Sequence, residues 1–213
     1  MIPPACRVAL LLGALLFAPG SYANDTEDEE DEAPGFSFNG SASWYAMRDQ
    51  PSYLSVVASA DHNDVHAEGR YNYEGRDAWS LFLGHNWSGG EDWTWSATPI
   101  FGGVFGSTHG VAPGLEFSLA HGSLDLYIEA EYLISGTAHE ENYFYSWNEL
   151  GWRVLPSLRL SLVGQRTRVI HTDRDIQRGL QAQLTLGKVT LGLAAFNPDA
   201  AARYTILSLA AGF

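Results

Sequence analysis

Residues 123–132 read Ser-Leu-Asp-Leu-Tyr-Ile-Glu-Ala-Glu-Tyr, and apolar side chains alternate with largely polar ones along the whole stretch. Leu124, Leu126 and Ile128 belong to one face of a strand, whereas Glu129 and Glu131 belong to the other. A period of two over this length predicts a β-strand with one face in apolar surroundings.

The same alternation recurs along the chain, for example over residues 36–44, 65–73 and 176–186. Eleven turn-like connections rich in Gly, Pro, Asn, Asp and Ser separate these stretches, which predicts twelve strands. Strands of about ten residues are long enough to cross a membrane when tilted. Ten strands is the alternative, because residues 93–106 and 143–154 alternate poorly.

A soluble β-sandwich would produce the same alternation with its apolar face inward. Here the apolar faces carry aromatic residues toward the strand ends, such as Trp44, Trp79 and Tyr132, as the interfacial girdles of membrane barrels do. The polar faces carry both signs of charge. The pattern therefore predicts an all-β protein, an antiparallel up-and-down transmembrane β-barrel over residues 36–213.

The last strand, residues 204–213, alternates and ends on an aromatic residue, Phe213. This end resembles the carboxy-terminal signature of bacterial outer-membrane β-barrel proteins, a class that includes small porin-like barrels. The resemblance implies a Gram-negative outer membrane, contact with its lipids and lipopolysaccharide, and recognition of Phe213 by the outer-membrane insertion machinery.

The first 35 residues are predicted to lie outside the barrel. Arg7 precedes an eleven-residue apolar run, and Ser21-Tyr22-Ala23 follows it, which predicts a signal peptide over residues 1–23 cleaved after Ala23. Residues 24–35 contain seven acids and form a predicted disordered acidic leader, because such a run repels itself and stays solvated.

The composition excludes several classes of protein. Twenty-five acids against twelve basic residues give a formal net charge of −13, which disfavours nucleic acid as a partner. Cys6 is the one cysteine, so a disulfide scaffold and a cysteine-rich zinc site are excluded. The sequence predicts no cofactor and no metal site, and it leaves the oligomeric state open.

The predicted lumen decides the functional hypothesis. Its polar residues include more acids than arginines, so a water-filled channel would favour cations or neutral small solutes. Related twelve-stranded channels for acidic sugars, by contrast, line their pores with Arg and Lys. The predicted lumen residues are Glu68, Arg70, Glu116, Asp125, Glu129, Glu131, Arg153, Arg159, Gln181 and Gln183.

Two alternatives to a channel stay open. Side chains fill many small barrels, which would leave a closed structural or surface-interaction barrel without transport. Some twelve-stranded barrels, such as outer-membrane phospholipase A, are lipid-cleaving enzymes that use Ser and His on an outer face. No matching motif surrounds His109, His121 or His139, so an enzyme is not predicted.

Two loops carry weaker candidate sites. Arg166, Arg168, Arg174 and Arg178 bracket one hairpin, where they could hold lipopolysaccharide phosphates or pair with neighbouring acids. His139-Glu-Glu-Asn142 could offer metal ligands, but adjacent loop residues make a poor preformed site, and we interpret the segment as a solvated loop.

Overall fold

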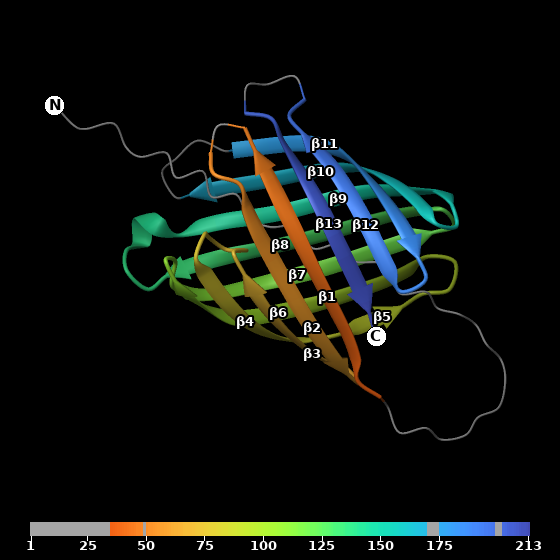
Figure 1. Ribbon diagram of the computed structural model, residues 1–213. Coiled ribbons are helices and arrows are strands. Elements are labelled where there is room, and N and C mark those ends of the chain that lie inside the picture. The colour runs from red at the N-terminus through yellow and green to blue at the C-terminus, as the bar shows by residue number, and fades with distance from the viewer. Residues whose placement is uncertain (1–34, 49, 170–174, 199–201) are drawn as a thin grey trace.

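The computed structural model describes residues 35–48, 50–169, 175–198 and 202–213. The predicted signal peptide and all of the acidic leader except Gly35 lie outside the described residues, as does Arg174. The described part of the chain folds into one closed antiparallel β-barrel (Figure 1).

Strands that follow one another in the sequence pair with each other, except that β4 and β5 both pair with β6. The strands are β1 (Ser37–Met47), β2 (Tyr53–His62), β3 (Val65–Tyr71), β4 (Ala78–His85), β5 (Trp87–Gly89), β6 (Thr94–Gly106), β7 (Gly110–His121), β8 (Leu124–Ser135), β9 (Tyr143–Leu155), β10 (Leu158–Val169), β11 (Asp175–Leu186), β12 (Val189–Phe196) and β13 (Tyr204–Gly212). A single 3₁₀ turn, η1 (His139–Glu141), lies between β8 and β9. β1 pairs with β13 from Asn39↔Gly212 to Met47↔Tyr204, which closes the barrel.

Thirteen strand segments make twelve barrel strands. β4 and β5 both pair with β6, and the register is continuous, since Gly84 pairs with Ile100 and Trp87 with Ala97. The two segments are therefore one strand interrupted at Asn86. The predicted twelve strands are confirmed, and the ten-strand alternative is wrong, because β6 and β9 are complete strands of 13 residues each.

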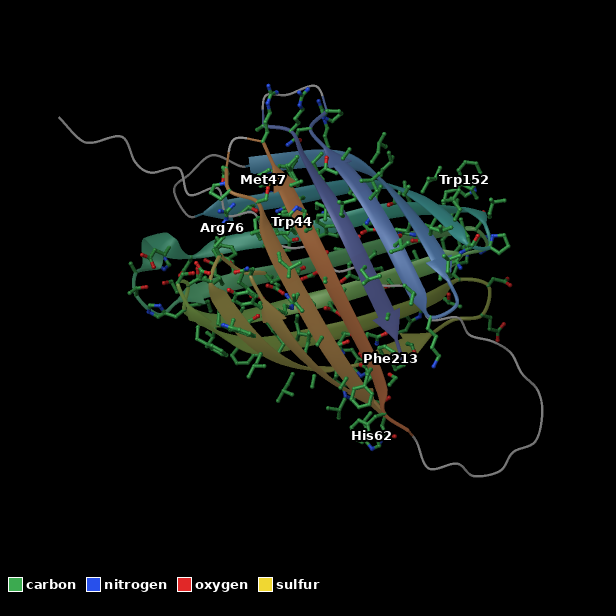
Figure 2. The ribbon with its side chains drawn as sticks, in the orientation of Figure 1. Trp44, Met47, His62, Arg76, Trp152 and Phe213 are labelled. Atoms are coloured by element: carbon green, nitrogen blue, oxygen red, sulfur yellow. The ribbon has the colours of Figure 1, made fainter. Side chains whose placement is uncertain are left out.

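The two ends of the barrel differ in the length of their connections. At one end, which we call the Phe213 end, tight turns join β2 to β3, β7 to β8, β9 to β10 and β11 to β12. Asn63 and Gly187 adopt positive φ there (52° and 60°), as two-residue hairpin turns require. The opposite, long-loop end contains η1. Figure 2 shows His62 and Phe213 at the first end and Met47 and Arg76 at the second.

The outward face is apolar. Large side chains such as Leu81, Leu162 and Leu180 are about 60% exposed, whereas the alternate residues of the same strands are buried. This inverts the usual soluble arrangement and fits a barrel whose outer band faces hydrocarbon. In the described part of the chain, no helix has the length and apolar composition needed to cross a membrane.

The interior is filled by side chains rather than by one continuous polar lining. Toward the long-loop end, Tyr45 stacks on Tyr53 with ring centroids 4.6 Å apart, and Phe196 stacks on Tyr204 at 4.8 Å. Trp147 adds a third contact, 5.4 Å from Phe196. These rings come from β1, β2, β9, β12 and β13, so they join widely separated parts of the wall.

Candidate functional site

The centre of the interior is one buried arginine with several carboxylates, which we call the Arg70 cluster. The Arg70 side chain, on β3, is fully buried. Its Nη1 donates to Glu129 Oε1 at 3.2 Å and to Glu74 Oε1 at 3.3 Å, and it also contacts Glu131. Its Nε donates to Glu68. One guanidinium therefore joins β3, β8 and the loop between β3 and β4.

Aromatic rings and hydroxyls complete the Arg70 cluster. The guanidinium carbon lies 4.3 Å from the ring centroid of Tyr73 and 4.5 Å from that of Phe82. The Tyr73 hydroxyl donates to Glu129 Oε2 at 2.6 Å, and Ser80 donates to Glu74 Oε2 at 2.7 Å. The rings exclude water on two sides, which strengthens the electrostatic interactions inside.

Strand register explains why the acids gather here. Glu116 on β7 pairs directly with Glu129 on β8, and both point inward. Like charges directly opposite each other destabilise a sheet unless a cation lies between them. Arg70 supplies one positive charge to Glu68, Glu74, Glu116, Glu129 and Glu131. When all are ionised, five negative charges face one positive charge, an excess of four.

A second cluster, the Arg159 cluster, lies nearer the Phe213 end. Arg159 Nη1 donates to Glu149 Oε2 and to Gln183 Oε1, both at 2.6 Å, and Arg159 Nε donates to Asp125 Oδ1 at 2.9 Å. Trp147 Nε1 donates to Glu149 Oε1 at 2.9 Å. These residues come from β8, β9, β10 and β11, so the cluster ties four consecutive strands together.

Gly151 makes room for the Arg159 cluster. A Cβ atom built at Gly151 would overlap the Arg159 guanidinium and the Asp125 carboxylate. The ion pair between these two residues thus occupies the space that a side chain at position 151 would take. Any larger residue there would have to displace one of the two charged groups.

The structure places the ten predicted lumen residues as follows. Eight are buried in the interior and Asp125 is half-buried, whereas Arg153 is exposed near the end of β9, next to the turn that follows it. The buried residues are Glu68, Arg70, Glu116, Glu129, Glu131, Arg159, Gln181 and Gln183. Gln181 lies beside Ser161 and Glu149.

Sequence reasoning missed several interior residues, among them His66, Tyr73, Glu74 and Glu149. His66 and Glu149 lie on the inward faces of β3 and β9, so alternation could have found His66, but the weak pattern of residues 143–154 concealed Glu149. The alternation of residues 65–73 puts Tyr73 on the face of Tyr71, and this is wrong, because β3 ends at Tyr71 and Tyr73 is buried in the interior. Glu74 belongs to the β3–β4 connection, which has no periodic signal, and only its packing into the interior identifies it.

Glu74 and Tyr73 lie outside the strands, and both titrate abnormally. Burial, followed by the nearby Glu131, raises the pKa of Glu74 from 4.5 to about 7, while Arg70 and Ser80 oppose the rise. Burial and the Glu129 carboxylate raise the pKa of Tyr73 well above its ordinary value. At neutral pH, therefore, Glu74 is in part protonated and Tyr73 keeps its hydroxyl proton.

The loop candidates whose side chains the structure describes have separate surroundings. The Arg166 guanidinium lies 5.6 Å from the ring centroid of Phe144, and Arg178 is exposed on β11; the Arg168 side chain, like Arg174, lies outside the described part. His139 Nδ1 lies 3.0 Å from Asn142 Nδ2, and hydrogen bonds from Thr137 and Ser135 lower the pKa of Glu141.

The hydroxyl and imidazole groups that a serine–histidine site would need have other neighbours. Ser107, two residues before His109, donates its hydroxyl proton to the main-chain carbonyl of Arg76. His121 stacks on Trp93 with centroids 4.5 Å apart, and its Nδ1 lies 2.9 Å from the Asp92 carbonyl oxygen. These contacts give no support to a serine–histidine nucleophile.

Solved structures with the same architecture identify the class of fold. The KdgM porin aligns with a TM-score of 0.62 and 9% identity over 81% of this chain and 99% of that one. The NanC porin aligns with a TM-score of 0.63 and 10% identity over 82% and 98%. The chain folds as a porin-like outer-membrane β-barrel. No protein-family model matches its sequence, and no curated protein does. At these identities the likeness to KdgM and NanC shows the fold alone.

Proposed function

We propose that this protein is a narrow channel of the bacterial outer membrane that passes small cations, or neutral solutes of similar size, in preference to anions. The exposed apolar band and the closed barrel support a membrane location, since a closed barrel leaves no strand edge with unpaired main-chain N–H and C=O groups. By the rule for this class, the Phe213 end faces the periplasm and the long-loop end faces outward.

The charge of the interior carries the proposal. The Arg70 and Arg159 clusters together contain two guanidinium groups and seven carboxylates. A confined lumen of this sign attracts cations and repels anions, because the low-dielectric wall focuses the field. One of the KdgM structures is in complex with oligogalacturonate, a polymer of carboxylates. The acidic interior of this chain disfavours such a polyanion as its solute.

The packed interior supports a small solute. The charged residues of the Arg70 cluster come from β3, the β3–β4 connection, β7 and β8. Tyr143 on β9 reaches across to the same connection, where its hydroxyl donates to the Glu74 carbonyl oxygen at 2.8 Å. Any permeant species must pass between these groups or exchange with them. Ions with few or no bound waters suit such a constriction better than oligosaccharides do.

Conductance across a planar lipid bilayer tests the proposal. With a KCl gradient, the refolded barrel should show a low conductance and a reversal potential of the sign that indicates K⁺ selectivity. Replacing Glu129 and Glu131 together by Gln should reduce that selectivity, whereas Glu141→Gln, in the long-loop end, should leave it nearly unchanged. Anion selectivity would overturn the proposal.

A second candidate is a closed structural barrel, and one observation favours it. The side chains of Tyr45, Tyr73, Tyr145 and Trp147 are all 0% exposed, so they fill the cross-section where they lie. A closed barrel should be silent in the bilayer and should begin to conduct when Tyr73 and Tyr145 are both replaced by Ala. A wild-type current above the lipid background would exclude this candidate.

Contact with lipopolysaccharide stays a proposal that rests on Arg166 and Arg178. Gly164↔Arg178 and Arg166↔Ile176 are register pairs of β10 and β11, so the two arginines lie on neighbouring strands toward the long-loop end. Arg178 is exposed and could donate to a phosphate. Loss of lipopolysaccharide co-purification in Arg166→Ala/Arg178→Ala would support the contact.

A further inference from the structure

Three side chains with ligand-type atoms converge in the interior beside Arg70, and two of them, Glu68 and Glu116, also belong to the Arg70 cluster. The third is His66, and each residue offers one ligand atom within 4.8 Å of the others. In the described part of the chain, His66 Nε2, Glu68 Oε2 and Glu116 Oε1 have no hydrogen-bond partner. The exposed fractions of His66, Glu68 and Glu116 are 2%, 3% and 5%. Buried polar atoms without partners are costly and need an explanation.

The second polar atom of His66 and that of Glu68 each contact a neighbouring side chain, and these contacts hold His66 Nε2 and Glu68 Oε2 in position. His66 Nδ1 lies 2.8 Å from Asp61 Oδ1, and Glu68 Oε1 accepts from Arg70 Nε. When Nδ1–H donates to a carboxylate, the lone pair of the imidazole is on Nε2. In the neutral tautomer with its proton on Nδ1, His66 presents the electron pair of Nε2 to the two carboxylates.

Asp61 is itself held by a chain of hydrogen bonds. Asn86 Nδ2 donates to Asp61 Oδ1 at 2.7 Å, and Thr98 Oγ1 donates to Asn86 Oδ1 at 2.7 Å. A carboxylate that orients a histidine, whose other nitrogen points into a set of ligand atoms, is the outer-shell arrangement of many metal sites. Asn86 is the residue at which the strand is interrupted between β4 and β5, and its side chain links Asp61 to Thr98.

From these observations, we propose that His66, Glu68 and Glu116 bind one divalent first-row transition-metal cation, with Zn²⁺ as the best match. One imidazole nitrogen and two carboxylate oxygens form a three-ligand set of the kind that Zn²⁺ binds with a fourth position left for a water molecule. The set is poor for Ca²⁺, which takes six to eight oxygen ligands. The nitrogen ligand also disfavours Mg²⁺.

The charge of the neighbourhood supports a cation. Arg70 leaves an excess of four negative charges when its five glutamates are ionised, and a divalent ion halves that excess. Arg70 Nη2 is 3.6 Å from Glu116 Oε1, too far for a hydrogen bond, and Nη2 also has no hydrogen-bond partner in the described chain. Glu116 therefore interacts with Arg70 by charge alone, and its Oε1 makes no hydrogen bond in the described chain.

The site does not depend on whether the barrel conducts. A closed barrel and a channel would both hold the ion, because the ligands come from the wall strands β3 and β7 and not from the loops. Binding can therefore be measured on the folded barrel in detergent, independently of any current.

The experiment uses the full chain, refolded in detergent, stripped with a chelator and titrated with ZnCl₂ by isothermal calorimetry. We expect one Zn²⁺ per barrel. His66→Ala and Glu116→Gln should each weaken the affinity at least about tenfold, and Asp61→Asn should weaken it by about 10- to 100-fold through loss of the orienting hydrogen bond. His121→Ala and Glu141→Gln are controls, since both residues are exposed and neither contacts the three ligands, and both variants should bind as the wild type does.

Co²⁺ provides a readout that a general loss of stability would not imitate. Bound in this set, it should show the intense visible absorption of a four-coordinate site, and Zn²⁺ should displace it at one equivalent. Heat-modifiability on a gel confirms that each variant is folded, and Glu68→Gln replaces His66→Ala if the latter does not fold. An absence of saturable binding, or equal binding by the wild type and the folded ligand variants, would overturn the proposal and leave ordered water as the partner of these atoms.

Discussion

Arg70 Nη1 on β3 and Glu129 Oε1 on β8 lie 3.2 Å apart inside the barrel, although four steps around the wall separate their strands. The contact crosses the lumen, so it bridges parts of the wall that share no main-chain hydrogen bond. Both side chains are buried, and the interaction is therefore weakly screened by water or salt.

Removing Arg70 should destabilise the barrel strongly. Arg70→Ala leaves its buried glutamates without their cation, and breaking a buried charge pair in this way costs about 3–5 kcal/mol. The change should appear as a lower urea midpoint for unfolding in detergent or lipid. Arg153→Ala is the control, because Arg153 is exposed; a similar loss in both variants would contradict the role assigned to the Arg70 cluster.

Adding a methyl group at Gly151 should disturb the Arg159 cluster. The new Cβ would press on Arg159 and Asp125, and overpacking of this kind costs about 1–3 kcal/mol. Gly164→Ala, on β10, should be nearly neutral, since a Cβ there meets nothing within 4 Å. Urea unfolding of both variants checks the difference, and equal midpoints would argue against a close contact at Gly151.

Two adjacent residues of β11, Leu180 and Gln181, should lie in lipid and in the barrel interior, respectively. Leu180 is 62% exposed on the outer face, whereas Gln181 is 5% exposed and inside. A lipid-phase reagent should therefore label Leu180→Cys and spare Gln181→Cys. Leu180→Arg should cost about 2–4 kcal/mol if the residue lies near the bilayer midplane. Preferential labelling at position 181 would invert the assignment of the faces.

Glu74 predicts a pH dependence of stability. Its pKa is about 7 in the folded protein against an ordinary 4.5, so the folded state holds a proton that the unfolded chain releases. This contribution is complete below pH 4.5 and is lost as the pH rises through about 7. The groups that face Glu74 are those of Arg70, Glu131, Ser80 and Tyr143. The Glu74→Gln variant keeps all four residues, so a difference between it and the wild type reports on Glu74.

The measurement compares wild type with Glu74→Gln, whose amide cannot titrate. Between about pH 5 and about pH 8, the urea midpoint of the wild type should fall more than that of Glu74→Gln. Parallel pH curves for the two proteins would show that Glu74 does not titrate in this range.

Phe213 should matter more for assembly than for stability. Its side chain is 73% exposed, and its main chain, not its ring, makes the two hydrogen bonds with Phe38 at 2.8 and 3.0 Å. Phe213→Asp should therefore refold in vitro with a nearly unchanged midpoint, but should reach the outer membrane of cells in much smaller amounts. Equal losses in the two experiments would count against an assembly signal.

Alternation along the chain was enough to predict the twelve strands and the side on which most of the predicted lumen residues lie. It works because a barrel in lipid repeats one rule, apolar outside and polar inside, at nearly every residue. The rule weakens where the lumen is filled by rings. On β9 the inward residues Tyr143, Tyr145 and Trp147 are aromatic, whereas the opposite face carries Ser146 and Asn148, so the usual alternation is lost.

The interior clusters could not be predicted from the sequence, because their members are distant in the chain. Arg70 and Glu131 meet only once barrel closure and strand register are known, and Glu74 joins them from a connection with no periodicity. Glu68 is two residues from His66 in the sequence, but the third ligand-type residue, Glu116, comes from β7. Spacing rules for metal sites do not cover such a set.

The pairing of β1 with β13 has a kinetic consequence. It is the seam of the barrel, and it joins the two most distant strands in the sequence, from Asn39↔Gly212 to Met47↔Tyr204. The loop-closure entropy of that seam must be overcome before its hydrogen bonds contribute, so this step should limit the rate of folding. Until the seam forms, β1 and β13 are two unsatisfied edges that can pair with other chains. Aggregation of this protein should therefore compete with one late event, and a catalyst that holds either edge strand would accelerate folding without changing the final stability.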